Sequence, residues 1–500
     1  MKLFSRFAIL TILILGLSAA VSAQETPYFP EPDLTNPAAP FIFTQNYAAA
    51  QGATAEWRKM EGVIIDEANQ KLYMAVTRTR NGMSDGAGDI QLEENRCGMV
   101  LVGDLDASWN VSRLTPLIIG GPYDEATSLC DSDNISEPDN VLVDANGDLW
   151  IYEDTDLHVN NMVWKYVVST GELLRFATLP VGSEGTGLSI TDNNQLFLNV
   201  QDPEDTSTAP YAVGTVGVVV GYAPTDSFAP LALAEGDAQL TLTIAAGEYQ
   251  ILAQSGVAFP GSEVLAGYTP ALNGEDMGVD VCNDPDGNMF LPQNEAQTEA
   301  ILYTNWECGP GGVSKLVMSQ NDDGSWTVDS GEMVDFASVN GVIYNCNASV
   351  TPWNTGLTSE EDAPLDAATW VEEYAEGLNA YVGGIANPYD YGYITELIPT
   401  ETGTEVVKHY AMGRRENEQS WVAPDSQTVY FGDDGTDKIF YKFIATTPGD
   451  LSAGTLYAAK VTQTGTDGVS DFGFDLEWIE LGTGNNADIE AAVRALDASA

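Results

Sequence analysis

The sequence repeats a turn followed by a strand, and this repetition limits the folds that the chain can adopt. In each repeat, a turn rich in Asp, Asn and Gly precedes residues that alternate between apolar and polar. The repeats cover residues 66–76, 144–154, 191–200, 284–294 and 423–434. Each of them predicts a hairpin turn that leads into a half-buried strand.

Partner strands are predicted next to these segments, at residues 98–105, 161–168, 311–318, 392–399 and 438–445. About four strands per unit predict an all-β protein, a β-propeller of about six blades. The units are unevenly spaced, so we expect insertions between them. Residues 203–270 are one insertion, which either completes a blade or forms a flap. Helical spacing predicts a short helix within residues 362–377 and a short C-terminal helix within residues 486–500.

The N-terminus has the three parts of an export signal. Lys2 and Arg6 give a basic start, an unbroken apolar stretch follows, and small residues end it at Ala23. This pattern is typical of a Sec-type signal peptide over residues 1–23, cleaved near Ala23. We expect residues 24–500 to form a single β-propeller domain that is secreted or periplasmic. No later segment reaches the roughly 18 apolar residues that span a bilayer, so no membrane partner is expected.

The charge balance excludes several classes of partner. The chain has 74 acidic residues against 19 Lys plus Arg, a formal net charge of -55. Such a surface repels nucleic acids and anionic membranes. Adaptation to a saline or calcium-rich medium would explain most of these acids. A small phosphate ester could approach only where bound cations reverse the local charge. We expect a monomer with a small-molecule substrate.

Five cysteines in an exported chain leave one without a partner. Cys97 with Cys130 and Cys282 with Cys308 are close in sequence, so two local disulfides are the simplest allocation, although sequence alone does not fix connectivity. Cys346 would then be free. A free thiol in an oxidising compartment is protected when it is buried or bound to metal. Cys346 is therefore a candidate metal ligand, with a small buried side chain as the alternative.

Acidic residues recur next to Gly or Pro at the ends of predicted strands, where they could point into the central tunnel of a propeller. The chain has only two histidines, so metal binding would depend on carboxylates. Each acid alone is more readily explained as a solvated turn residue, but their recurrence in successive units favours a shared site. The candidate ligands, with one amide among them, are Cys346, Glu61, Asp139, Asn140, Glu184, Glu307, Glu360, Glu361, Glu418, Asp433 and Asp434.

Several of these motifs together resemble the PhoX family of secreted alkaline phosphatases. The segments that carry the resemblance are NC at 345–346, TPWNTGLTSEE at 351–361, GYITELIPTETG at 392–403, GDDG at 432–435, YKF at 441–443, MEGVIID at 60–66, PDNVLVDANGDLWIYED at 138–154, EGTG at 184–187 and FLNVQDPED at 197–205. The resemblance implies a six-bladed propeller that holds Fe³⁺ and Ca²⁺ ions. It also implies hydrolysis of phosphate monoesters, with some tolerance for diesters.

The resemblance also implies roles for single residues. Cys346 would be the thiolate ligand of iron, and Glu307 and Glu418 would be metal carboxylates. Glu61 and Glu184 match further acidic ligands. Asp139 and Asn140 match a turn that resembles a calcium site. Lys59, or Arg58 in its place, would be the cationic contact to the phosphoryl group.

Three departures from the family pattern bear on activity. The half that carries MEG, PDN and EGTG precedes the half that carries NC, TPW and GDD, as in a circular permutation, which a closed ring tolerates. The family's phosphate-clamping Arg is here Lys59, so a bidentate fork becomes a point charge. The family's His positions beside Glu307 and Glu418 are Trp306 and Asn417.

Two other functions remain open from the sequence. A calcium-stabilised propeller could bind a ligand or a surface without catalysis, which the change to Lys59 would favour. A calcium-dependent lactonase could use Glu61, Asn140 and Asp434 at the tunnel mouth. Cys346 separates these hypotheses, because neither alternative needs a thiolate at the centre whereas an iron–calcium phosphatase does.

Overall fold

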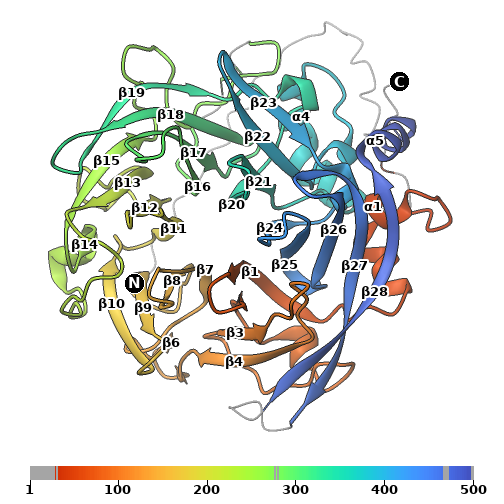
Figure 1. The fold of residues 1–500 in the computed structure, drawn as a ribbon, viewed down its shortest axis with the longest axis horizontal. Helices are drawn as coiled ribbons and strands as arrows, with labels where there is room; N and C mark the ends of the chain where they lie inside the picture. The colour runs from red at the N-terminus through yellow and green to blue at the C-terminus, as the bar shows by residue number, and fades with distance from the viewer. Residues whose placement is uncertain (1–28, 30–31, 275–276, 279–280, 466–471, 497–500) are drawn as a thin grey trace, which may run out of the picture.

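The fold is a ring of antiparallel sheets, seen along its axis in Figure 1. The structure, a computed structural model, describes residues 29, 32–274, 277–278, 281–465 and 472–496. The predicted signal peptide therefore lies outside the described residues. Among those that are described, no helix is both apolar enough and long enough to cross a membrane. The predicted all-β propeller architecture is confirmed.

Six meanders of four antiparallel strands account for most of the described chain. The innermost strands are β1 (Trp57–Asp66), β7 (Pro138–Val143), β11 (Glu184–Ile190), β16 (Pro285–Pro292), β20 (Asn345–Val350) and β24 (Asn417–Val422). The second strands are β2 (Lys71–Val76), β8 (Leu149–Glu153), β12 (Leu196–Gln201), β17 (Glu299–Trp306), β21 (Gly356–Glu360) and β25 (Thr428–Lys438).

The two outer positions of each meander complete the sheets. The third strands are β3 (Met99–Asp104), β9 (Met162–Val167), β13 (Thr215–Val220), β18 (Gly312–Gln320), β22 (Ile394–Thr400) and β26 (Tyr441–Thr447). The fourth strands are β4 (Arg113–Ile119), β10 (Glu172–Thr178), β15 (Glu248–Gln254), β19 (Trp326–Met333), β23 (Gly403–Lys408) and β27 (Asp450–Thr464). The additional strands are β5 (Tyr123–Asp124), β6 (Leu129–Cys130), β14 (Thr243–Ile244) and β28 (Gly473–Asn485).

Contacts between the innermost strands close the ring. Strand β1 contacts β7, which contacts β11, and the series continues through β16, β20 and β24 back to β1. Two strand pairings join the ends of the chain: β1 pairs with β25, and β28, which also pairs with β27, pairs with β4. The first and last meanders therefore share one nine-stranded sheet. This hydrogen-bonded seam fixes β1 against β25.

The predicted insertion completes a meander. Within residues 203–270, strands β13 and β15 join β11 and β12 in one sheet, while β14 extends the neighbouring sheet at β10. One predicted turn is placed differently. Residues 284–294 were expected to begin with a turn, but β16 already starts at Pro285, so Asp286 lies within an innermost strand.

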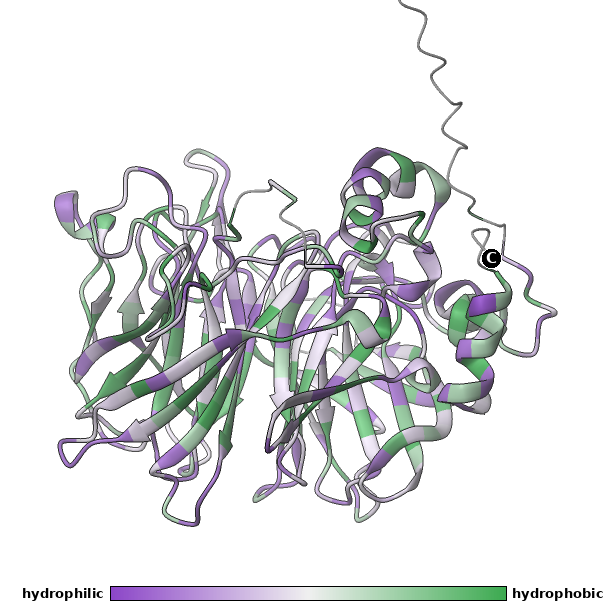
Figure 2. Ribbon diagram, turned by 90° about the horizontal axis from the view of Figure 1, so that it is seen from above, coloured by the Kyte–Doolittle hydropathy of each residue, from purple (hydrophilic) through white to green (hydrophobic). Residues whose placement is uncertain are grey.

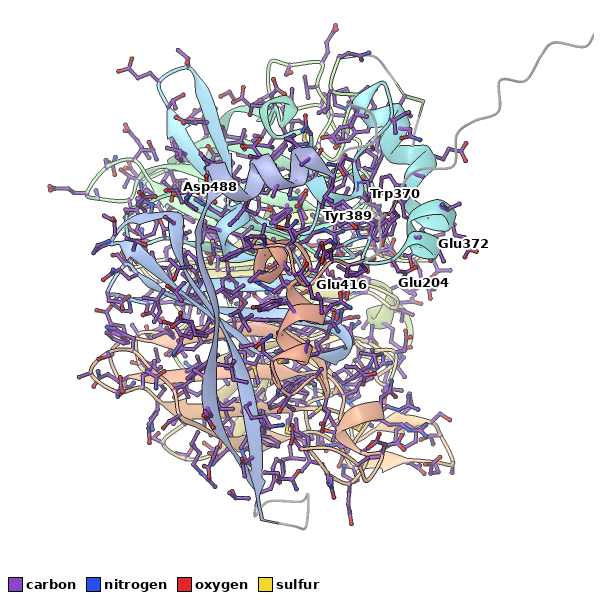
Figure 3. The ribbon with its side chains drawn as sticks, turned by 90° about the vertical axis from the view of Figure 1, so that its right-hand side faces the viewer. Glu204, Trp370, Glu372, Tyr389, Glu416 and Asp488 are labelled. Atoms are coloured by element: carbon purple, nitrogen blue, oxygen red, sulfur yellow. A yellow bond between two sulfur atoms is a disulfide. The ribbon has the colours of Figure 1, made fainter. Side chains whose placement is uncertain are left out.

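The described chain also contains helical segments. They are α1 (Ala39–Ile42), α2 (Thr44–Ala50), α3 (Ala367–Thr369), η4 (Trp370–Tyr374), α4 (Ala375–Val382) and α5 (Asn486–Ala495). Short 3₁₀ turns are η1 (Asn81–Met83), η2 (Gly236–Leu240), η3 (Ala337–Val339), η5 (Pro388–Asp390) and η6 (Tyr410–Met412). Both predicted helices are present. Figure 3 shows Trp370 and Glu372 on the first of them and Asp488 on the C-terminal helix.

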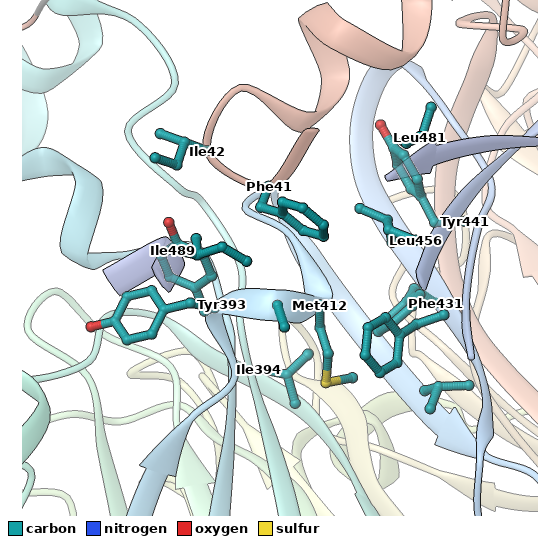
Figure 4. Close-up of a cluster of buried hydrophobic side chains, with 14 of the residues drawn as sticks. Phe41, Ile42, Tyr393, Ile394, Met412, Phe431, Tyr441, Leu456, Leu481 and Ile489 are labelled. Atoms are coloured by element: carbon teal, nitrogen blue, oxygen red, sulfur yellow. The ribbon is translucent and has the colours of Figure 1, made fainter. Parts of the chain in front are cut away.

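The hydrophobic core is divided among the interfaces between neighbouring meanders. Leu149 and Ile151 of β8 pack against Ile64 and Tyr73 of the preceding meander, and similar clusters fill the other interfaces. In Figure 4, one cluster also includes Phe41 from α1. Figure 2 shows the hydrophobic residues mostly on the strands and hydrophilic ones in the loops. Both faces of an inner strand are thus occupied by packing.

Candidate metal centre at one mouth of the ring

Each innermost strand contains a β-bulge at the same place. In all six, the inner strand advances by three residues where the second strand that pairs with it advances by two. The bulges lie between Met60 and Val63, Pro138 and Val141, Thr186 and Ser189, Pro285 and Asn288, Asn345 and Ala348, and Asn417 and Ser420. A bulge changes the direction in which a side chain points. Both faces of these strands are packed against neighbouring strands, so a side chain needs this change of direction to point into the tunnel.

The first residue inside the bulge carries a metal-ligating group in five of the six strands. These residues are Glu61, Asp139, Asp286, Cys346 and Glu418, and all are buried. The bulge of β11 carries Gly187 instead, with φ of +66°. A Cβ there would lie 2.2 Å from Asn199 Nδ2, so a side chain does not fit. Glu184, at the start of β11, supplies the acid from this meander.

Short distances join these side chains across strands. Cys346 Sγ lies 2.9 Å from Asp286 Oδ2 and 3.2 Å from Glu418 Oε2. Single ligand atoms of Glu61, Asp139 and Glu418 all lie within 4.8 Å of one another. The predicted meeting of a thiol with acids that are distant in the sequence is therefore present in the structure.

A second set of polar residues surrounds the first. In five meanders, the residue where the bulge begins pairs with a residue of the second strand, and the residue after that partner is polar. These polar residues are Thr77, Asp154, Glu307, Glu361 and Asp434. Glu307 shares a group of ligand atoms within 4.8 Å with Asp286 and Cys346, and Glu361 shares one with Cys346 and Glu418. Thr77 Oγ1 donates to Glu61 Oε1 over 3.0 Å. We call these two sets of residues, with Glu184, the acid ring.

Burial and repulsion favour the protonated forms of several groups in the acid ring. Burial, followed by the nearby charge of Asp434, raises the pKa of Glu61 to about 7. Burial and then the charge of Glu61 raise the pKa of Asp139 and of Glu418 well above the usual range. Burial and then the charge of Asp286 do the same to the pKa of the Cys346 thiol. Bound cations would reverse these shifts, because an opposite charge stabilises the ionised forms.

Atoms without hydrogen-bond partners fit the same cations. Asp139 Oδ1, Asn140 Oδ1 and Asp286 Oδ1 are buried and have no hydrogen-bond partner among the described residues. Buried oxygens without partners are costly unless something satisfies them. Carboxylate and amide oxygens are the ligands that Ca²⁺ prefers, and a thiolate suits a softer transition metal. The donor set therefore fits Ca²⁺ together with a softer transition metal.

Lys59 is the cation nearest to the acid ring. Its Nζ lies 3.1 Å from Glu61 Oε1 and 3.5 Å from Asp434 Oδ1. The side chain of Arg58 points elsewhere, donating to the hydroxyl of Thr436. Burial acts to raise the pKa of Asp434, but the charge of Lys59 together with hydrogen bonds at the carboxylate outweighs burial, and the pKa is lowered. The structure thus favours Lys59 over Arg58 as the cationic residue that the sequence predicted.

Two predicted ligands point away from the acid ring, because successive residues of a strand alternate in direction. Glu360 Oε1 lies 3.1 Å from Lys408 Nζ, and Glu360 Oε2 accepts from the backbone of Gly392 and Tyr393 over 2.9 Å each. The buried Asp433 interacts electrostatically with Arg415. The neighbours Glu361 and Asp434, also predicted, occupy the ring positions.

Other predicted residues lie in or beside the ring. Glu184 Oε1 and Glu307 Oε2 both accept from Gln201 Nε2, over 3.2 and 2.9 Å. Burial, followed by the charges of Asp154 and Glu307, raises the pKa of Glu184 well above its usual range. Asn140 is buried within the β7 bulge, directly after Asp139.

Besides Thr77, three residues in or beside this site were not predicted from the sequence. Asp286 was assigned to a turn, although Pro285-Asp286-Gly287 parallels Pro138-Asp139-Asn140 and could have identified it. Asp154, whose charge adds to the effect of burial on the pKa of Glu184, is the last residue of the segment 138–154 and was not singled out within it. Lys438, at the end of β25, forms an ion pair with Glu416, and burial lowers its pKa to about 8.

The disulfides and the two histidines have structural contacts. The predicted pairs Cys97–Cys130 and Cys282–Cys308 are present, and Cys346 is free and buried. The second disulfide joins Cys308, the residue after Glu307, to Cys282 in the segment that leads into β16. His158 and His409 bind the buried Glu153 and Glu396 at 3.0 and 2.9 Å. Trp306 donates to a serine hydroxyl, and Asn417 donates to two backbone carbonyls.

Comparison with known families agrees with this geometry. The family model "Alkaline phosphatase PhoX" matches residues 24–204 and 281–499. The chain belongs to the PhoX family. The match omits residues 205–280, which include β13 and β15, so the PhoX pattern covers the ring except for the outer strands of one meander. No curated protein matched the chain.

Solved structures give weaker similarities. PhoX of Pseudomonas fluorescens, in complex with the transition-state analogue vanadate, is 20% identical with a TM-score of 0.31, and the match covers 44% of this chain and 55% of that one. The chain thus aligns with about half of that relative. The calcium-binding protein regucalcin from Agrobacterium tumefaciens is 9% identical with a TM-score of 0.37, covering 76% and 84%. A gluconolactonase from Xanthomonas campestris is 14% identical with a TM-score of 0.28, covering 63% and 90%.

Proposed function

We propose that this PhoX-family protein is an exported, metal-dependent phosphatase that hydrolyses phosphate monoesters, with some tolerance for diesters, at calcium and iron ions held by the acid ring. One observation carries the proposal. A buried thiol, Cys346, lies within hydrogen-bonding distance of the carboxylates of Asp286 and Glu418, each contributed by a different inner strand. Family membership supports the same reaction class.

The ring divides into two groups of ligands. Cys346, Asp286, Glu307, Glu361 and Glu418 combine one soft sulfur with hard oxygens, and they would hold iron. Glu61, Asp139 and Asn140 offer only oxygen and would hold calcium, with Glu418 shared between the groups. When bound, the cations would neutralise the charge of the ester and stabilise the charge that develops in the transition state.

Lys59 would be the protein side chain whose positive charge contacts the phosphoryl group, in addition to the bound cations. Its backbone has φ of 47°, in the left-handed region, next to the β1–β25 pairing. Glu61 and Asp434 hold its ammonium at the edge of the ring. Cations on the carboxylates would weaken these ion pairs and free the ammonium for a phosphate oxygen. As a point charge, Lys59 orients the ester less strictly than an Arg fork would.

The same ion pairs favour a second function. If Lys59 stays on Glu61 and Asp434, the acid ring would remain a calcium site without a free cation for the ester, as in a binding propeller. A calcium-dependent lactonase using Glu61, Asn140 and Asp434 belongs to the same alternative. We place both second, because a calcium site does not need the Cys346 thiol.

The compartment and the oligomeric state complete the proposal. Two disulfides support an oxidising compartment, in agreement with the predicted export. We propose that the protein acts as a monomer on small phosphate esters.

Metal analysis and an activity assay test this function together. The purified protein should contain calcium and iron by mass spectrometry and should hydrolyse p-nitrophenyl phosphate. Chelation should remove the activity, and adding both metals back should restore it. Protein that carries both metals but hydrolyses neither p-nitrophenyl phosphate nor bis-p-nitrophenyl phosphate would refute the proposal and favour the binding propeller.

A further inference from the structure

A second cavity lies at the end of the ring opposite the acid ring. It has a volume of about 620 Å³, and all six innermost strands line it. Their contributions include Ile65, Leu142, Ile190, Phe290, Val350 and Trp421. In β1, Ile65 lies four residues beyond Glu61, which corresponds to about 13 Å along a strand. We call this space the far cavity.

Buried amides separate the far cavity from the acid ring. Gln419 Oε1 accepts from Val63 N over 2.9 Å, while its Nε2 donates to Ala348 O over 3.0 Å. Asn288 Nδ2 donates to Gly187 O and to Asn199 Oδ1 over 2.9 and 3.0 Å. These bonds cross between neighbouring meanders at the level of the bulges. The far cavity is therefore a separate site that does not use the metal ligands.

The lining combines apolar surface with uncharged polar groups. Leu142, Ile190, Phe290, Val350 and Trp421 supply the apolar part. Hydroxyls and amides come from Ser189, Thr191, Asn288, Gln297, Ser349, Thr351 and Asn354. The charged residues that line the cavity, Glu67 and Asp192, are acidic and exposed. Anions, including phosphate esters, are therefore excluded from this site.

Two polar atoms in the lining have no protein partner. Ser349 is 4% exposed, and its Oγ has no hydrogen-bond partner among the described residues. Gln297 Oε1 is likewise buried without a partner, and the amide nitrogen of the same side chain donates to Asp192 over 3.0 Å. Unsatisfied groups in the wall of a cavity indicate that a ligand with its own donors and acceptors binds there.

We propose that the far cavity binds a neutral saccharide. A sugar ring presents an apolar face that would lie against Trp421 and hydroxyls that would bond to Ser349 and Gln297. The acidic rim would accept further hydroxyl protons from the sugar. A purely apolar ligand would leave these polar atoms unsatisfied. The volume lies within the range of small-molecule sites.

Titration with uncharged sugars tests the proposal. Methyl α-D-glucopyranoside, maltotriose and cellotriose would be titrated into the full-length protein, with saturation-transfer NMR and tryptophan fluorescence as readouts. At least one should bind saturably. Ser349→Ala should weaken its binding about threefold to tenfold through a lost hydrogen bond. Trp421→Ala should weaken it by at least about tenfold through lost ring contact.

Matched variants separate loss of binding from loss of folding. Ser207→Ala is the control, because Ser207 is also buried with an unpartnered Oγ but does not line the far cavity. It should leave sugar binding unchanged. Trp421 packs against two core clusters, so Ser349→Val, which fills the cavity, replaces it if Trp421→Ala does not fold.

Tetramethylammonium and an apolar dye would be titrated in parallel as a cationic and an apolar probe. Three results would overturn the proposal: no sugar binds, the binding of sugar is unaffected by both Ser349 variants, or only one of these two other probes binds. Hydrolysis of p-nitrophenyl phosphate by the Ser349 variants should equal that of the parent protein, since the site lies apart from the acid ring.

Discussion

Cys346 Sγ and Asp286 Oδ2 lie 2.9 Å apart, although 60 residues separate them in the chain. They come from β20 and β16, two innermost strands in contact, and each is the first residue inside its bulge. The repeated bulge therefore places residues from different meanders at the same height in the tunnel. The candidate metal site in this fold depends on that shared position more than on any local sequence motif.

Replacing the thiol tests its role as a ligand. Cys346→Ser should lower the iron content and the activity by at least about 10- to 100-fold. That is the usual cost of losing a residue that only orients a metal ligand, and losing the ligand itself should cost at least as much. Calcium content should change less, because Glu61 and Asp139 remain. Iron analysis by mass spectrometry and hydrolysis of p-nitrophenyl phosphate check both expectations. Ser349→Ala, three residues along β20, is the control. A Cys346→Ser protein with full iron and turnover would contradict the assigned role.

Two aspartates close in sequence allow a matched comparison. Asp286→Asn should reduce the metal content, because Asp286 contacts Cys346 from the bulge position of β16. Asp284→Asn should retain the metal, because Asp284 lies beside a disulfide whose sulfurs are not free to bind. Metal content and activity would be measured on both. Equal losses in the two variants would argue against the special role of the bulge position.

The fold was largely predictable, since the turn–strand repeats at residues 66–76 and 423–434 correspond to β2 and β25. The ligands in the acid ring were less predictable from the sequence. Glu360 and Glu361 are adjacent acids, and only the register of β21 decides which one faces the axis. Asp286 follows a proline in an Asp-Pro-Asp-Gly run that is typical of a turn, and the bulge that gives it a different role is set by pairing with β17.

Metal-free protein should lose stability as the pH rises. Burial and the charge of Asp434 raise the pKa of Glu61 from 4.5 to about 7 in the folded state. The folded protein thus holds this proton more tightly than the unfolded chain, so stability is greatest below pH 4.5 and falls until about pH 7. Thermal unfolding in EDTA across this range measures the effect. Calcium should remove the fall, and Glu61→Gln should reduce it. A melting temperature that rises with pH in EDTA would contradict this expectation.

Lys59 should contribute through its charge. Lys59→Ala should lower the turnover of p-nitrophenyl phosphate by about a hundredfold, the usual cost of losing one group that stabilises transition-state charge. Lys59→Arg should retain activity within about threefold or increase it, because guanidinium binds phosphate bidentately. Arg58→Ala is the control, since Arg58 donates to Thr436. A larger loss for Arg58→Ala than for Lys59→Ala would reverse the two roles.

Adjacent glutamates should separate stability from metal binding. Glu360 and Lys408 form a fully buried ion pair, and removing one partner of such a pair costs about 3–5 kcal/mol. Glu360→Gln should therefore lower the free energy of unfolding by about that amount and leave the metal content intact. Glu361→Gln should lower the metal content while leaving metal-free stability unchanged or higher, because burial and repulsion by Glu307 already disfavour the charge of Glu361. Urea unfolding in EDTA and metal analysis distinguish the two variants. Loss of metal from Glu360→Gln would place that carboxylate in the acid ring, against the alternation of β21.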